Sequence, residues 1–354
     1  MSSFIKNAWY VALWAESLGP GQIVQREIAG HDIAIYRTPD GTPAALDDRC
    51  PHRSAPLHMG RVCPNGNLQC GYHGLQFDAT GACAVNPHGK GIIPVALRVR
   101  SYPVVERHSL IWVWTGEQTA DPALIPDLSV IDRAAPKDVT FRDVLEMDAN
   151  YQLVIDNLLD LSHVAFLHGG VLGNDSTVAA DISVTQEGDS VTVSRWMPNV
   201  KPPGLFDMLF QRDGSLVDHW SAITWMAPSC LLNNAGVTAV GAPQREGTGI
   251  FGLHLLTPVN ERKTVYHFAA VRQNPLPFPE DVHAKIMEDL KVLRRKAFVT
   301  EDEPMIEAQQ RVIDKVGAEA ARPVLLAVDG GPVRYRRVLD DIRVRQAASE
   351  HRHG

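Results

Sequence analysis

The sequence has no long apolar run, few cysteines and no excess of positive charge. Only 5 of its 354 residues are cysteine, and its formal net charge is −7. The apolar stretch after Lys6 is broken by Glu16, so it is too short to span a membrane, and no small-residue cleavage site accompanies it. We therefore expect a cytoplasmic protein that does not enter a membrane. The negative net charge gives no reason to expect a nucleic acid as a partner.

Possible metal ligands are concentrated between residues 50 and 73. Two cysteine–histidine pairs, Cys50-Pro-His52 and Cys70-Gly-Tyr-His73, are separated by 17 residues. Two thiolates and two imidazoles can hold tetrahedral zinc or an iron–sulfur centre. In a Rieske [2Fe–2S] centre, two cysteines bind one iron and two histidines bind the other. Each short pair can give one ligand to each iron, whereas zinc sites more often use Cys-x-x-Cys or His-x-x-x-His pairs. The spacing therefore favours a Rieske cluster over structural zinc.

The stretch CPHR…CGYHG resembles the cluster-binding signature of the Rieske family. High-potential respiratory members of that family carry a disulfide between the two loops. The corresponding positions here are Ala55 and Tyr72, so the resemblance points to the ferredoxin and oxygenase branch. The remaining three cysteines are interpreted as ordinary thiols, and their odd number is typical of a reducing compartment. They are Cys63, Cys83 and Cys230.

Two other histidines of this region are rival ligands. His58 follows the first pair but has no cysteine at the paired spacing. His88 lies in the turn sequence Asn-Pro-His-Gly. We expect neither to bind a metal.

Length and turn signals indicate about two domains. Short β-prone runs with frequent turns predict a small antiparallel domain over residues 1–118. Three prolines and little periodicity mark residues 119–136 as a linker. Residues 137–354 combine strand-like runs with helices predicted at 150–161 and 279–316, the latter with a break at Pro304, so the fold class is α+β. The strand-like runs are 139–147, 182–184, 191–196, 221–226, 231–240, 250–256 and 265–271.

A second group of possible ligands lies in the run DNLLDLSHVAFLH, residues 156–168. On a continuous helix, Asn157, Asp160 and His163 share one face, whereas His168 is rotated off it unless the helix ends nearby. Two histidines and a carboxylate form the facial triad of non-haem Fe(II) oxygenases, which leaves positions open for O₂. Taken alone, such a run is more often a polar helix face. The Rieske motif upstream makes a metal site the favoured interpretation of this run, because a one-electron carrier needs an acceptor for its electrons.

Together these segments resemble the Rieske non-haem iron oxygenases over essentially the whole chain. The resemblance covers CPHR…CGYHG, NPHG, LIWVW, NLLDLSHVAFLH and VTEDEPMIEAQQ. It implies a helix-grip catalytic domain, in which an antiparallel sheet has helices over one face. It also implies a third iron ligand, Asp302, for which the adjacent Glu301 is the alternative. The implied ligands are Cys50, His52, Cys70 and His73 for the [2Fe–2S] cluster and His163, His168 and Asp302 for the mononuclear iron.

Members of this family are trimers in which the cluster of one subunit feeds the iron of its neighbour. The resemblance therefore implies a homotrimer with electron transfer between subunits. Asp160 matches the residue that joins His73 of the neighbouring chain to His163 of its own chain. A carboxylate that accepts N–H from both rings would fix their tautomers and couple the two metals. Asn157 matches a position beside the iron.

Within the family, FIKNAWYVA, HDIAIYRTPDG and DNLLDLSHVAFLH resemble the aromatic O-demethylase group, of the vanillate demethylase and dicamba monooxygenase kind. The resemblance implies that NADH or NADPH supplies electrons through a flavin- and iron–sulfur-containing reductase. Oxidation of a methoxy carbon by O₂ would then give a hemiacetal that collapses to a phenol and formaldehyde. Asn233 and His254 match residues that bind the carboxylate of a small aromatic acid, although a buried strand histidine is more often structural.

Two alternatives to O-demethylation remain at this point. One is a ring-hydroxylating Rieske oxygenase that acts on another aromatic acid. The other, from a different class, is a Rieske electron-transfer protein without oxygenase activity. An electron-transfer protein would need only the two Cys–His pairs, so this alternative gives no function to residues 137–354.

Overall fold

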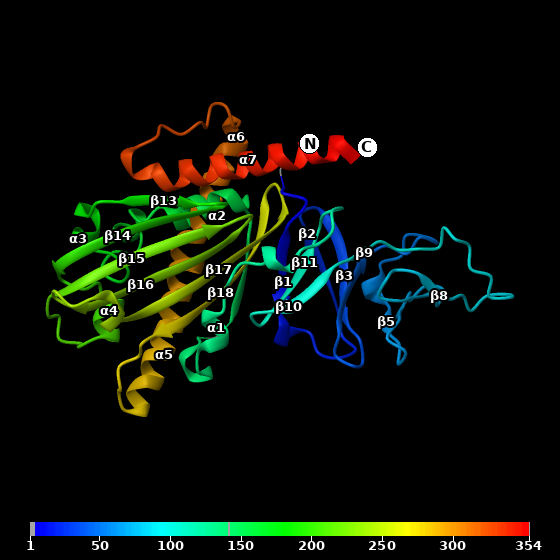
Figure 1. The fold of residues 1–354 in the computed structure, drawn as a ribbon, viewed down its shortest axis with the longest axis horizontal. Helices are drawn as coiled ribbons and strands as arrows, with labels where there is room; N and C mark the ends of the chain where they lie inside the picture. Colours follow the sequence, from blue (N-terminus) through cyan, green and yellow to red (C-terminus); the bar gives the residue numbers. More distant parts are fainter. Residues whose placement is uncertain (1–3, 141, 354) are drawn as a thin grey trace. The chain divides into compact units, whose positions relative to one another are not determined.

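The computed structural model describes residues 4–140 and 142–353, without the side chains of residues 350–353. It divides into two compact units, which are coloured along the chain in Figure 1. The first unit runs to Ile125 and also includes Thr257–Asn260, and the second comprises Pro126–Leu256 and the chain from Glu261 onward. The division at Ile125 falls inside the predicted linker.

Three small sheets make up the first unit, and their strand orders are β1-β11-β10, β2-β3-β4-β9 and β5-β6-β7-β8. All their neighbouring strands pair antiparallel, as the frequent turn signals predicted. The strands are β1 (Trp9–Trp14), β2 (Ile23–Ile28), β3 (His31–Arg37), β4 (Pro43–Asp47), β5 (Arg61–Val62), β6 (Leu68–Gln69), β7 (Gln76–Phe77), β8 (Cys83–Val85), β9 (Ser101–Tyr102), β10 (Val104–Arg107) and β11 (Leu110–Trp114), with 3-10 turns η1 (Ala15–Ser17), η2 (Leu57–Met59) and η3 (Pro122–Leu124).

The β7–β8 turn illustrates how local sequence fixes this unit. Asp78 accepts hydrogen bonds from the backbone N–H groups of Thr80 and Ala82 through Oδ1. Gly81 has a φ of +77°, and a Cβ there would lie 1.9 Å from the carbonyl oxygen of Val99. Only glycine fits such a backbone conformation and such a close approach.

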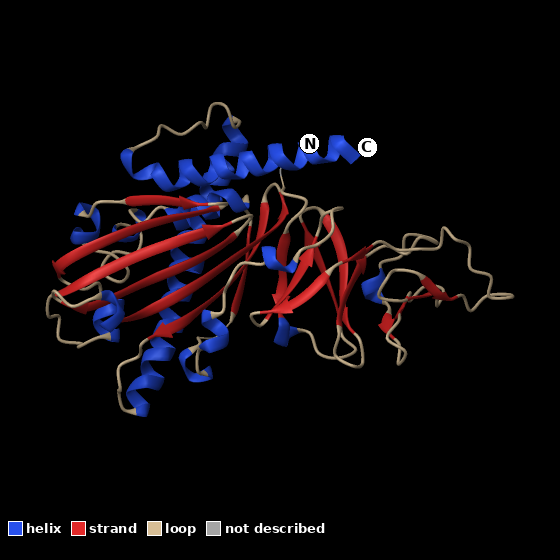
Figure 2. Ribbon diagram, viewed as in Figure 1, coloured by secondary structure: helices blue, strands red, loops and turns tan. Residues whose placement is uncertain are grey.

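A seven-stranded antiparallel sheet dominates the second unit, with strand order β12-β18-β17-β16-β15-β14-β13 (Figure 2). Each predicted strand-like run of this unit coincides with one of these strands, although most of the strands are longer than predicted because the runs continue through polar residues. The strands are β12 (Asp143–Met147), β13 (Ser183–Glu187), β14 (Ser190–Val200), β15 (Val217–Met226), β16 (Cys230–Ala239), β17 (Thr248–Asn260) and β18 (Lys263–Gln273).

Helices cover one face of this sheet, and Figure 1 shows α5 passing behind it. The side chains that α5 buries, which include Ile286 and Leu290, recur at helical spacing and pack against Val217, Ala235 and Ile250 of the sheet. Helices over one face of an antiparallel sheet confirm the predicted α+β, helix-grip fold. The helices are α1 (Val130–Arg133), α2 (Tyr151–Leu159), α3 (Asp175–Ala179), α4 (Gly204–Leu209), α5 (Glu280–Arg295), α6 (Glu303–Val316) and α7 (Gly330–His353), with 3-10 turns η4 (Pro136–Asp138), η5 (His163–Ala165), η6 (Gln244–Glu246) and η8 (Ala327–Asp329) and the π-helix η7 (Lys296–Asp302).

The helix that carries the second motif is shorter than predicted. Asn150 caps its N-terminus by accepting from the N–H of Gln152, and the helix ends at Leu159. Asp160 already has extended backbone angles, with φ −85° and ψ 95°. The prediction that Asn157, Asp160 and His163 share one face of a continuous helix is therefore wrong. His163 begins the separate turn η5 instead.

The predicted break at Pro304 is a π-helix rather than an interruption. Pro304 lies in the first turn of α6, directly after the π-helix, and cannot donate the i→i−4 hydrogen bond to the turn before it. The widened turn η7 lies just before it and ends at Asp302. Single π turns of this kind occur frequently at functional sites, because they redirect a side chain without ending the helix.

Candidate metal centres and substrate cavity

The two cysteine–histidine pairs lie on two loops with matching backbone hydrogen bonds. The N–H of Cys50 donates to the carbonyl of Ala55, and the N–H of Cys70 donates to that of Leu75, at 2.9 and 2.8 Å. Both cysteines are buried, whereas His52 is exposed and its ring centroid lies 4.5 Å from that of the half-buried His73. Two buried thiols with two outer imidazoles match the donor set of a [2Fe–2S] Rieske cluster, in which each iron takes one kind of ligand.

The rival histidines of this unit have other partners. The Nδ1 atom of His58 pairs with the carboxylate of Asp48. The Nε2–H of His88 donates to the backbone carbonyl of His73 at 2.7 Å. His88 therefore stabilises the loop that carries His73. This contact is a structural role for the turn Asn-Pro-His-Gly that could not be predicted from its sequence.

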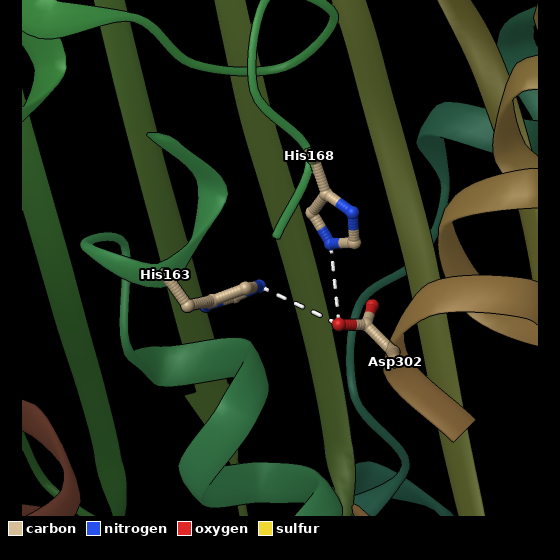
Figure 3. A group of neighbouring side chains, drawn as sticks. All are labelled: His163, His168 and Asp302. Carbon is tan, nitrogen blue, oxygen red and sulfur yellow. Dashed lines mark ion pairs between the residues drawn. The ribbon is translucent and has the colours of Figure 1, made fainter. Parts of the chain in front are cut away.

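The second motif and the C-terminal acidic segment meet in the second unit, against the large sheet (Figure 3). His163, His168 and Asp302 each offer one ligand atom, and these atoms lie within 4.8 Å of one another. Oδ1 of Asp302 is 3.7 Å from Nε2 of His163 and 3.2 Å from Nε2 of His168. Asp302 is only 3% exposed. The helix end at Leu159 and the turn η5 bring His168 back beside His163.

Hydrogen bonds at the far side of each ring define which atoms face the centre. The Nδ1 of His163 contacts the backbone oxygen of Asp160, and the Nδ1 of His168 lies 2.7 Å from Oε2 of Glu301. Because both oxygens are acceptors, each Nδ1 carries the proton and each Nε2 presents a lone pair. In the neutral rings, two Nε2 lone pairs and a carboxylate oxygen thus converge on one point, where a cation can bind. This donor set fits the 2-His-1-carboxylate triad of mononuclear non-haem iron.

Neighbouring charges act on the pKa of the two histidines in different ways. Burial lowers the pKa of His163, although Asp302 and Asp160 oppose this effect. Burial also opposes protonation of His168, but Asp302 and Glu301 outweigh it and raise the pKa of that imidazole. The carboxylates therefore make the centre attractive to positive charge.

The other two predicted residues of this motif lie beside the triad. Asn157 donates from Nδ2 to Oδ1 of Asp302 at 3.1 Å, so it orients the carboxylate. Oδ2 of Asp160 lies 4.0 Å from Nδ1 of His163, farther than the backbone oxygen of the same residue. Its Oδ1 accepts from the N–H of Ser162 at 2.7 Å. The contact of Asp160 with His163 in this structure is thus made by its backbone oxygen.

Sequence analysis missed Arg195, which holds the loop between α2 and η5. This residue of β14 is 4% exposed. Its guanidinium donates to the carbonyls of Leu161 and Thr177 and to the hydroxyl of Ser162, at 2.8, 2.9 and 2.7 Å. An arginine on a strand gives no signal in the sequence that it serves a distant loop.

A cavity adjoins the triad and contains about 740 Å³ of space between atoms, part of it open to solvent. Asn233 and His254 line it, from β16 and β17. Oδ1 of Asn233 and Nε2 of His254 are both buried without a hydrogen-bond partner among the described residues. A Cβ on Gly252 would lie 2.9 Å from Nε2 of His254 and 3.3 Å from Cβ of Asn233, so glycine at this position leaves room for both side chains.

His219 is a further cavity residue that sequence analysis missed. It lines the cavity from β15, is 2% exposed, and neither of its ring nitrogens has a partner within the described part of the chain. Burial lowers the pKa of His219 to about 4, so the ring is neutral at pH 7. Its alternation with Val217 and Ser221 places it on one face of the strand, but no local pattern indicates that it lies near the triad.

Comparisons with known proteins agree with this arrangement of two centres. The Rieske [2Fe-2S] domain matches residues 8–103, and the vanillate O-demethylase oxygenase C-terminal domain matches residues 147–345. The chain is 37% identical over 343 residues to the oxygenase component of chloroacetanilide N-alkylformylase from Rhizorhabdus wittichii, covering 95% of each chain. It belongs to the Rieske oxygenase family of O-demethylase oxygenase components.

Other members of this Rieske oxygenase family show the same extent of similarity. The oxygenase component of dicamba O-demethylase from Stenotrophomonas maltophilia is 37% identical over 348 residues, which are 98% of this chain and 100% of that protein. The crystal structure of dicamba monooxygenase bound to 3,6-dichlorosalicylic acid superposes with a TM-score of 0.89 at 36% identity, over 98% of this chain and 99% of that one.

Membership of the Rieske oxygenase family implies a Rieske [2Fe–2S] cluster and a mononuclear iron. Oxygenase components work in multi-component systems, so the family also implies a separate reductase as partner. None of the described helices is both long and apolar enough to cross a membrane.

Proposed function

We propose that this oxygenase component oxidatively O-demethylates a methoxylated aromatic acid such as vanillate and releases formaldehyde. Electrons come from NADH or NADPH through a flavin- and iron–sulfur-containing reductase. The observation that carries the proposal is the cavity itself. Buried polar atoms of Asn233 and His254, which have no hydrogen-bond partner among the described residues, line the same space as the triad. Such polar atoms in a largely apolar cavity orient a ligand rather than stabilise the fold.

The ligands of the proposed centres follow from the donor sets described above. Iron held by the triad supplies the activation of O₂ that oxidation of a methoxy carbon requires. The cluster is held by Cys50, His52, Cys70 and His73, and the iron by His163, His168 and Asp302.

Substrate binding and orientation are the work of the cavity residues. Leu158, Ile223 and Phe298 provide apolar walls that exclude water from the reacting carbon. Asn233 and His254 receive the carboxylate of the acid, which directs the methoxy group toward the triad. Because positioning decides which carbon is oxidised, these two residues set the site of reaction.

We also propose that the functional assembly is a homotrimer. Oδ2 of Asp160 accepts from the cluster residue His73 of a neighbouring subunit, while the backbone oxygen of Asp160 holds His163 of its own chain. Asp160 thereby forms the path for electrons between the cluster of one subunit and the iron of the next. The half-buried carboxylate, whose side chain is 29% exposed, leaves Oδ2 accessible for that contact.

The test is a formaldehyde assay with a panel of methoxybenzoates that includes vanillate. The purified protein is supplied with NADH, O₂ and a flavin–iron–sulfur reductase. The proposal predicts formaldehyde and a phenol in amounts that match the NADH consumed. Hydroxylated or diol products without formaldehyde would contradict O-demethylation and indicate ring hydroxylation instead.

A further inference from the structure

A buried arginine that forms no ion pair among the described residues stacks on Phe298, a residue of the cavity wall. Arg294 is 7% exposed, and its Nη1 and Nη2 atoms have no hydrogen-bond partner among the described residues. It makes no ion pair within that part of the chain, and it stacks on Phe268 and Phe298, 5.5 and 5.4 Å from their ring centroids. Burial lowers the pKa of Arg294 to about 10, so the guanidinium is still charged at pH 7. A buried charge that forms no ion pair is costly, and the carboxylate of a bound ligand would lower that cost.

A hydrogen bond connects this region to the cavity. Nδ1 of His254 pairs with the hydroxyl of Tyr266 on the neighbouring strand β18. Burial, followed by the charge of Arg294, lowers the pKa of His254 well below its usual value, so the imidazole is neutral and carries one proton. Burial raises the pKa of Tyr266 well above its usual value against the opposing effect of Arg294, so the phenol keeps its proton.

Two arrangements of this pair are possible, and they give the cavity opposite properties. If the Tyr266 hydroxyl donates to Nδ1, Nε2 of His254 carries the proton and offers a donor to the cavity. If Nδ1 donates to Tyr266, Nε2 is an acceptor instead. The positive charge of Arg294 attracts the oxygen end of the phenol dipole and repels its hydrogen, which favours donation toward Nδ1. Nε2–H then faces the cavity as a donor.

We propose that Arg294 and Tyr266 are positioning residues that select an anionic substrate. They hold His254 in the tautomer that presents Nε2–H, and the charge of Arg294 balances the carboxylate bound by His254 and Asn233. The amide of Asn233 can present either its oxygen or its NH₂ to the cavity, because the two are related by a 180° rotation. This inference rests on the proposed function, since it specifies the charge of the substrate at the same site.

Two purely structural roles for Arg294 are less consistent with the contacts. In the last turn of α5, an arginine can bind the final helical carbonyls, but Nη1 and Nη2 of Arg294 bind none. Asp143 acts on Arg294 electrostatically, but it pairs instead with the adjacent Arg295. The stacking on Phe268 and Phe298 holds the guanidinium in place without neutralising it.

The test compares binding of 3-methoxybenzoate and of the neutral analogue 3-methoxybenzamide by calorimetry. The holoprotein is used as wild type and as the variants Arg294→Gln and Tyr266→Phe. The control is Arg272→Gln, because Arg272 is likewise buried with unpartnered guanidinium nitrogens but has no electrostatic effect on His254 or Tyr266. If these residues were only structural, their replacement would weaken binding of both ligands equally. If they select for charge, their replacement weakens binding of the acid alone.

We expect wild type and Arg272→Gln to prefer the acid. Arg294→Gln should reduce the ratio of acid affinity to amide affinity at least about tenfold, with amide binding little changed. Tyr266→Phe, which retains the Arg294 charge, should reduce the same ratio by a smaller factor. An unchanged ratio in both variants, or a wild type that prefers the amide, would overturn the inference. Failure of wild type to release formaldehyde would instead contradict the proposed function, because the binding ratio does not depend on turnover.

Discussion

The Nδ1 atom of His168 lies 2.7 Å from Oε2 of Glu301, the residue directly before Asp302. Two consecutive residues of the π-helix therefore act on the same imidazole, Glu301 from its Nδ1 side and Asp302 from its Nε2 side. A carboxylate that accepts from the distal nitrogen fixes the tautomer and raises the basicity of a metal-binding histidine. Glu301, the alternative ligand in the sequence, is thus a second partner of His168 in the structure.

The first prediction is that Glu301→Ala weakens iron binding at the mononuclear site. The loss should be about 10- to 100-fold in affinity, as is usual when the carboxylate behind a metal-binding histidine is removed. Competition with an iron chelator measures it, and the Rieske absorption spectrum should not change.

The neighbouring variant Glu303→Ala is the matched control, since Glu303 has no contact with either triad histidine among the described pairs. Equal iron affinity in Glu301→Ala and wild type would mean that the contact with His168 is incidental.

The second prediction concerns the iron ligand His163. His163→Ala should abolish turnover and lower the iron content while the cluster spectrum stays intact, because the two donor sets lie on separate segments of the chain. Iron analysis and visible absorption on the same sample measure both. Retained activity would show that the triad is not the oxygen-activating site.

The third prediction concerns Asp160. Replacement by Asn should slow the reoxidation of the reduced cluster in the presence of substrate and O₂ without removing either metal, because the amide is a weaker acceptor for the histidine N–H groups. Stopped-flow absorption measures the rate, and the exposed Asp175→Asn is the control. A rate equal to that of wild type would exclude the proposed role of Asp160 between the centres.

The fourth prediction is an acid-dependent loss of stability caused by His219. Its pKa is about 4 in the folded state and about 6.5 when unfolded, so between these values the unfolded chain binds more protons. Stability therefore falls as the pH decreases through this window, by about 2 kcal/mol at pH 5 from this residue alone. His219→Phe should lose correspondingly less stability between pH 7 and pH 5 in urea unfolding. The same pH dependence in both proteins would contradict the neutral, buried state of His219.

Much of the architecture could be predicted from sequence because it depends on local patterns. The paired Cys–His spacing, the alternating strand runs and the two triad histidines are visible in short segments of the chain, whereas Asp302 was assigned from the resemblance to the family. Helix α7 was not predicted, since its start, Gly330-Gly331-Pro332, is typical of a loop. Its buried residues Tyr335, Leu339 and Ile342 nevertheless recur at helical spacing.

The remaining features depend on tertiary contacts that no short segment reveals. The end of α2 at Leu159 is fixed by the loop contacts of Arg195, which lies more than thirty residues away in β14. Whether Glu301 or Asp302 faces both histidines depends on the π turn before Pro304. No local pattern singles out His219 or Arg294, because their burial and their lack of hydrogen-bond partners among the described residues arise only in the folded chain.

The most direct test of the account is a single turnover without reductase. The protein is reduced, freed of reductant and mixed with O₂ and a methoxybenzoate that it binds, and formaldehyde is quantified against mononuclear iron. We expect formaldehyde in proportion to that iron, together with oxidation of the cluster, and no formaldehyde from Asp302→Asn. Oxidation of the cluster in the presence of bound substrate, without formaldehyde, would contradict oxidative O-demethylation by this chain.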